Sequence, residues 1–282
     1  MFIETLKEVD LHARLALIAG IMLLRYALFA GIAYWICYVW KRKAWEPKKI
    51  QLKYPTAYAV RQEILYSIST IGIFVGIGFL MRLAQEHAVT KVYTDIGRYG
   101  WGYLAVSVLL AILIHDTYFY WTHRFMHLTW VFPHVHRVHH RSHNPTPWAA
   151  FSFHPSEALI EASVFPVIAF LLPIHPLALF IVATWMITMN VLGHLGYELY
   201  PAGMLQHSVA KWLNTSTHHN MHHQHVGGNY GLYFNFWDKL VGTNFENYEK
   251  KFAENATGIR RRKRNEGNPS TETERKTQSV HA

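Results

Sequence analysis

Histidines carry the chemistry that stands out in this 282-residue chain. Eight of its 20 histidines form three clusters with spacings of three and four residues. Such spacings place side chains on one face of a helix, so each cluster can present its imidazoles together. Neutral imidazole is a common metal ligand in proteins, and the clusters therefore predict metal binding. They consist of His123 and His127, of His136, His139 and His140, and of His219, His222 and His223.

Eight ligands exceed what one metal ion uses, since a tetrahedral zinc site takes about four. The surplus predicts two metal ions held close together. Within each HxxHH motif, two histidines can bind one ion and the third its neighbour. His154 and His194 are single residues that we expect to complete the two coordination shells, and Asp116 is a candidate support for a ligand or simply a solvated carboxylate.

The kind of metal follows from the ligands and from the chemistry they allow. Cys37 is the one cysteine and lies in an apolar segment, which excludes a thiolate site. Imidazole suits zinc, copper, nickel and iron. Zinc has no redox change, whereas two iron ions can activate O2 for attack on an unactivated C–H bond. The residues alone do not choose among these metals, but the redox argument favours two iron ions, with O2 as co-substrate.

The apolar segments predict an all-α integral membrane fold. Residues 15–40 and 64–81 are each long enough for a bilayer core, which needs about 20 helical residues. Residues 101–121 form a third candidate, and 158–172 with 177–193 form a hairpin of membrane segments around two prolines. The expected architecture has about four transmembrane helices and a histidine-rich helical cap that holds a dimetal site.

Positive charge predicts the orientation and the surroundings. Seven Lys and Arg residues between 41 and 61 follow the first span, so this loop should be cytoplasmic and the N-terminus outside. The metal site would then face the cytoplasm, in a bacterial inner membrane or the endoplasmic reticulum. The net charge is +9, and many of the basic residues lie next to the first apolar segment. This position favours anionic lipid headgroups over nucleic acid as a partner.

The domain boundaries follow the same composition. Residues 1–100 should form an N-terminal membrane region with two transmembrane helices and the basic loop. Residues 101–250 should form the catalytic domain with the histidine clusters. Residues 251–282 are rich in charge and predict a disordered basic tail.

The clusters and their flanks resemble the fatty acid hydroxylase superfamily, also called the sterol desaturase family, from about residue 114 to 245. The resemblance rests on the clusters in order, with Phe153-His154-Pro155, Asn229-Tyr230-Gly231 and Trp237-Asp238 between and after them. The pattern is most similar to C-5 sterol desaturases. It implies four membrane helices, a cytoplasmic diiron site, O2 as oxidant and a lipid substrate. The ligands it implies are the eight clustered histidines with His194, and His154 as a further possibility.

These observations predict an O2-dependent non-haem diiron oxidoreductase of lipid biosynthesis that hydroxylates or desaturates a sterol-like or fatty acyl substrate. No dinucleotide-binding fingerprint is evident, so electrons should come from an external donor, either a cytochrome b5-like protein or a ferredoxin. The alternatives are a histidine-rich membrane protein for metal transport or storage and a membrane cytochrome. Sequence leaves open the lipid, the choice between hydroxylation and desaturation, and the oligomeric state.

Overall fold

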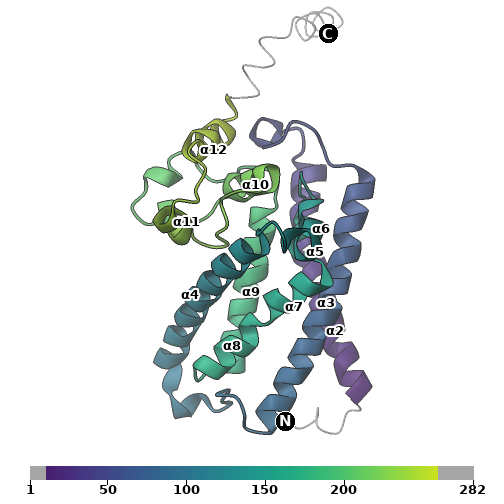
Figure 1. Ribbon diagram of the computed structural model, residues 1–282, viewed down its shortest axis with the longest axis vertical. Coiled ribbons are helices and arrows are strands. Elements are labelled where there is room, and N and C mark those ends of the chain that lie inside the picture. The colour runs from purple at the N-terminus through teal and green to yellow at the C-terminus, as the bar shows by residue number, and fades with distance from the viewer. Residues whose placement is uncertain (1–10, 260–282) are drawn as a thin grey trace, which may run out of the picture.

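The computed structural model describes residues 11–259 and is built from helices (Figure 1). Within this range, bridges such as Lys49 with Tyr197 are isolated and no strand forms. The elements in chain order are α2 (Leu11–Tyr34) with the π-helical turn η1 (Trp35–Trp40), η2 (Glu46–Lys48), α3 (Ala57–Glu86), η3 (Ile96–Arg98), α4 (Gly100–Met126), α5 (Phe132–Val135), α6 (Arg137–His140), η4 (Pro147–Phe151), α7 (Pro155–Ala162), α8 (Val164–Leu171), α9 (Pro176–Gly193), η5 (Met204–Gln206), η6 (Ala210–Trp212), α10 (Ser216–His225), α11 (Phe236–Val241) and α12 (Tyr248–Thr257).

Four helices of the described chain are long and apolar enough to cross a membrane. They are Leu11–Trp40, Ala57–Glu86, Gly100–Met126 and Pro176–Gly193. Large apolar side chains such as Leu24, Leu80 and Leu109 point outward and are 58–63% exposed. Such apolar side chains are stable when they face lipid tails, because they are then not exposed to water. The predicted all-α membrane architecture with four candidate spans is confirmed, and the chain is an integral membrane protein.

The first arm of the expected hairpin is different from the prediction. Residues 158–172 were expected to form one membrane segment, but α7 ends at Ala162 and α8 begins at Val164, each with eight residues. Pro166 explains the break, because it has no N–H to donate to the carbonyl four residues earlier and its ring clashes with that carbonyl. The arm is therefore two short helices, and only α9 of the hairpin is long enough to span alone.

The histidine motifs gather at one end of the helices. The turn before α9 lies at the other end, where Tyr93 N–H donates to the carbonyl of Ile174 at 3.1 Å. The basic loop after α2 lies beside the histidines, since Gln51 Nε2 donates to Asn220 Oδ1 on α10 at 3.0 Å. Figure 1 shows α5, α6 and α10 at this end, above most of the length of α4 and α9. The basic loop and the histidine clusters thus lie at the same end of the helices, which is consistent with the predicted orientation.

The C-terminal boundary also needs a correction. The tail was expected to begin at residue 251, but α12 continues to Thr257. Tyr248 and Phe252 of α12 are buried in a small cluster with Met221 of α10. Residues 251–257 therefore belong to the cap. From residue 260 onward, the expected tail lies outside the described residues.

Candidate metal centre

Nine histidines converge in two groups near the C-terminal ends of α4 and α9. In each group, one ring nitrogen per residue lies within 4.8 Å of the others. The five-histidine group consists of His123, His127, His136, His140 and His222, and the four-histidine group consists of His139, His194, His219 and His223. All are buried except His127, which is partly exposed.

The spacing between imidazole nitrogens fits shared metal coordination. His123 Nε2 lies 3.0 Å from His136 Nε2, and His222 Nε2 lies 3.0 Å from His140 Nε2. In the other group, His219 Nε2 lies 3.0 Å from His194 Nε2 and 3.1 Å from His223 Nε2. Two nitrogens bound about 2.1 Å from one ion at roughly a right angle are about 3 Å apart. The donor set of imidazoles suits iron, and also zinc or copper.

The two HxxHH motifs each divide between the groups. In the first motif, His136 and His140 join the five-histidine group while His139 joins the other. In the second, His219 and His223 join the four-histidine group while His222 crosses over. The two histidines four residues apart thus share one group, and the histidine three residues after the first belongs to the neighbouring group. The motifs interlock the two groups, as their spacing predicts.

Hydrogen bonds fix the orientation of several rings. His123, His194 and His222 donate through Nδ1 to backbone carbonyls at 2.7–2.8 Å. Nδ1 of His139 lies 3.2 Å from the carbonyl of Ser152. A donor at Nδ1 leaves Nε2 without a proton, so that its lone pair is free to bind a metal.

One ring is oriented by a carboxylate that the sequence did not single out. Nδ1 of His136 lies 2.7 Å from Glu157 Oε1, and both side chains are buried. Glu157 stands in the first turn of α7, three residues after the N-cap His154. Its proximity to Phe153-His154-Pro155 is the one signal that the sequence offers for this carboxylate. Such a carboxylate raises the basicity of the imidazole that it contacts.

A second carboxylate, Asp238, supports the loop behind His123. Its two oxygens accept the N–H groups of Tyr230 and Gly231 at 2.9 and 2.7 Å, and the carbonyl of Tyr230 accepts from His123. Burial alone would raise the pKa of Asp238, but hydrogen bonds from His218, Thr243 and Gly231 lower it to about 2. The residue is therefore ionised at neutral pH and holds the loop by charge-assisted bonds.

Burial keeps the imidazoles neutral. It lowers the pKa of His136, His139 and His222, and neighbouring imidazoles lower the pKa further. The pKa of His194 falls to about 4. Because an imidazolium ion loses its hydration in such a site, the neutral form is favoured. This is the form that binds metal ions.

Two residues singled out in the sequence lie apart from both groups. His154 caps α7, with its Nδ1 3.3 Å from the N–H of Ser156. Its ligation stays a prediction that this position does not support. Asp116 accepts the backbone N–H groups of Tyr233 and Phe234 and contacts no ligand ring in the described residues. It secures the segment after α10 rather than a histidine.

Comparisons with known proteins support the family resemblance that the histidine motifs indicate. The family model described as "Fatty acid hydroxylase" matches residues 108–243. A Delta(7)-sterol 5(6)-desaturase of Aspergillus fumigatus is 30% identical over 236 residues, which are 77% of this chain and 71% of the relative. A Delta(7)-sterol 5(6)-desaturase of Gibberella zeae is 31% identical over 65% of this chain and 55% of its own length.

Lathosterol oxidase of Mus musculus is a further relative, 30% identical over 201 residues, which are 69% of this chain and 62% of the relative. The chain thus spans little more than half of the Gibberella zeae relative. No solved structure matches the chain.

Proposed function

Because the chain belongs to the fatty acid hydroxylase family, we propose that it is a membrane-bound, O2-dependent oxidoreductase that hydroxylates or desaturates a lipid. The substrate would be sterol-like or fatty acyl. The two histidine groups would each hold one iron ion, five residues around one ion and four around the other. A bound iron pair would supply the O2 activation that breaking an unactivated C–H bond requires.

The observation that carries this proposal is the interlocked arrangement of the groups. His139 and His140 are neighbours in sequence and lie in different groups, with ring centroids 5.8 Å apart. Two ions held this way would share a rigid frame. A structural metal site needs only one closed shell, whereas a pair of adjacent ions suits redox chemistry.

The protein's own residues would orient the ligands and keep the centre dry. Glu157 and the carbonyls of Tyr230 and Gly228 hold the rings of His136, His123 and His222. Phe132 packs on the partly exposed His127, with ring centroids 5.4 Å apart. It would reduce the exposure of this imidazole to water. The alignment of the substrate carbon would decide between an alcohol and an alkene.

The surroundings of the site support a cytoplasmic orientation. The basic loop after α2 and the histidines lie at the same end of the helices, and short basic loops stay in the cytoplasm. We propose that electrons reach the centre from an external carrier of the cytochrome b5-like or ferredoxin type. Arg137 lies within the first HxxHH motif, Arg141 follows it, and both are exposed, which suits an acidic carrier.

Lipid extracts of cells provide the test of the proposed activity. Cells that express the chain should contain a lipid heavier by one oxygen or lighter by two hydrogens than cells that express His222→Ala, and the purified chain should hold close to two irons. Identical lipid extracts, together with metal bound by the wild-type chain, would instead favour metal storage or transport.

A further inference from the structure

Arg25 places a cation in the middle of the membrane region. It is the charged residue of the first apolar segment, and its Nη2 donates to the carbonyl of Ala183 on α9 at 2.8 Å. Ala183 precedes His194 by eleven residues, a rise of about 16 Å along a helix. This is about half of the ~30 Å hydrocarbon core of a bilayer. Charges at this depth are rare and commonly mark a binding site or a transport path.

The contacts of Arg25 leave part of its hydrogen-bonding capacity for a ligand. Its guanidinium lies 5.8 Å from the ring centre of Phe180. No carboxylate of residues 11–259 forms an ion pair with it, and a guanidinium has five N–H donors. A cation held in an apolar region without a counter-ion attracts an oxygen acceptor, and an acidic one most strongly.

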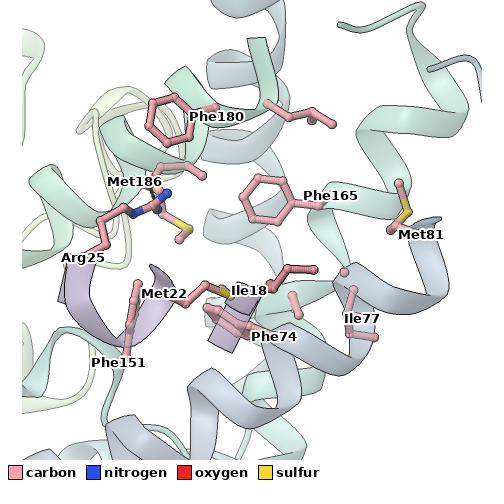
Figure 2. Close-up of a pocket in the computed structure, with 14 residues that line it drawn as sticks. Ile18, Met22, Arg25, Phe74, Ile77, Met81, Phe151, Phe165, Phe180 and Met186 are labelled. Carbon is pink, nitrogen blue, oxygen red and sulfur yellow. Dashed lines mark hydrogen bonds between the residues drawn. The ribbon is translucent and has the colours of Figure 1, made fainter. Parts of the chain in front are cut away.

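The guanidinium borders an apolar cavity of about 350 Å³ between α2, α3, α8 and α9. Figure 2 shows Arg25 reaching towards Met186 and Phe180, with Phe165 and Phe74 on other walls. Arg25 is the only charged residue among those that line it. Volumes of about 300–1,000 Å³ and mostly apolar walls are typical of small-ligand sites.

Two aromatic residues connect the cavity wall with the four-histidine group. Phe151 lines the cavity, and its ring centroid lies 6.4 Å from that of Phe153. The ring of Phe153 lies 5.2 Å from the ring of His139. Phe153 therefore neighbours both a residue of the cavity wall and a histidine of the four-histidine group.

We propose that this cavity binds the lipid substrate in one direction, with an oxygen-bearing end, hydroxyl or carboxylate, hydrogen-bonded to Arg25 and the hydrocarbon body directed towards Phe153 and His139. The proposal rests on the proposed function and adds an anchor to it. The carbon that reacts is then remote from the anchored oxygen, by about the 16 Å of helix between Ala183 and His194. A substrate lacking such an oxygen would bind in several positions and react weakly.

The experiment measures binding without turnover. The full-length protein is reconstituted in phosphatidylcholine nanodiscs, with no electron donor, and exposed to a long-chain fatty acid that carries a photoactivatable diazirine in its chain. The matching alcohol and the matching hydrocarbon are the other two probes. Labelled peptides are mapped by mass spectrometry, and we expect the acid or the alcohol to label the cavity segments that contain Phe165 and Met186.

Two sets of variants separate an anchor from a structural role. Arg25→Gln should reduce labelling by the oxygen-bearing probes about tenfold, because a hydrogen bond to a charged group is lost. Arg25→Lys should retain most of it. Gly78→Leu should fill the cavity and block labelling, since no atom lies within 4 Å of a Cβ at this position. Gly72→Leu on the same helix has equal space and lies outside the cavity, and it should label normally.

The outcomes test the binding of a lipid oxygen by Arg25 separately from the proposed enzymatic activity. Labelling by the acid alone assigns a carboxylate, and labelling by the alcohol alone assigns a hydroxyl. Equal labelling by the hydrocarbon, unchanged labelling in Arg25→Gln, or no labelling of the wild-type cavity would overturn the anchor. Iron content and product formation are measured separately, so a failure of the proposed activity would be visible as missing iron or product while cavity labelling persists.

Discussion

His136 and Glu157 are joined by a buried hydrogen bond of 2.7 Å that ties α7 to the five-histidine group. The bond crosses between segments 21 residues apart and places a carboxylate directly behind a ring of the group. It makes the position of α7, one of the two short helices that replace a continuous membrane arm, part of the site.

Removing this carboxylate should weaken metal binding. Glu157→Ala should lower the iron affinity about 10–100-fold, as is usual when the partner of a ligating histidine is lost. Glu157→Gln retains an acceptor and should lose less. Iron bound per chain, measured over a range of free iron concentrations, checks this order. Glu161→Gln, one turn later in α7, is the matched control, and an equal loss in that variant would point to general damage to α7.

Histidines inside the two groups should matter far more for activity than a histidine outside them. His139→Ala and His222→Ala each remove one nitrogen from a different group, and product formation should fall by at least 100-fold in both while the protein still inserts in the membrane. His154→Ala removes a histidine that lies outside both groups and should retain most activity. Loss of iron in the His154 variant would return this residue to the ligand set.

Acid should destabilise the metal-free protein. Burial lowers the pKa of His194 to about 4 from the usual 6.5, so the unfolded chain binds this proton before the folded chain does. The contribution of neutral His194 is complete above pH 6.5 and is lost as the pH falls towards 4, at about 1.4 kcal/mol for each pKa unit. Thermal unfolding of iron-free protein at pH 7.5, 6 and 5 should show a falling midpoint. A midpoint that rises with acid would show that the rings are charged in the folded state.

Labelling of single cysteines should reveal the orientation. Cys37 is the one native cysteine and is buried, so Cys37→Ala provides a clean background. In that background, Lys43→Cys lies on the basic loop at the histidine end and Val89→Cys at the other end of α3. An impermeant thiol reagent added to intact cells should label position 89 and spare position 43. The reverse pattern would place the metal centre outside the cytoplasm.

The sequence predicted the helical membrane class and all nine histidines that converge in the described residues. Eight of them are marked by spacing on a helix, which is a local property. It also anticipated that each HxxHH motif serves two neighbouring positions. The division of particular residues between groups depends on how α6 and α10 face each other, which no local spacing determines.

The supporting carboxylates were missed for the same reason. Glu157 and Asp238 act on rings and loops distant in sequence, and a lone acidic residue has no periodic signal. Asp116, which follows His115, was a candidate support or a solvated carboxylate, and it instead accepts a hydrogen bond from the backbone N–H of Tyr233. The break between α7 and α8 could have been predicted, since Pro166 lies inside the apolar run.

The partial exposure of His127 makes the two metal positions unequal in their exchange with the medium. A metal ion in the five-histidine group would have one ligand within reach of water and small chelators, whereas all four histidines of the other group are buried. Stripping by a chelator would then begin at the five-histidine group. Partial treatment would leave half-filled protein rather than a mixture of empty and full copies.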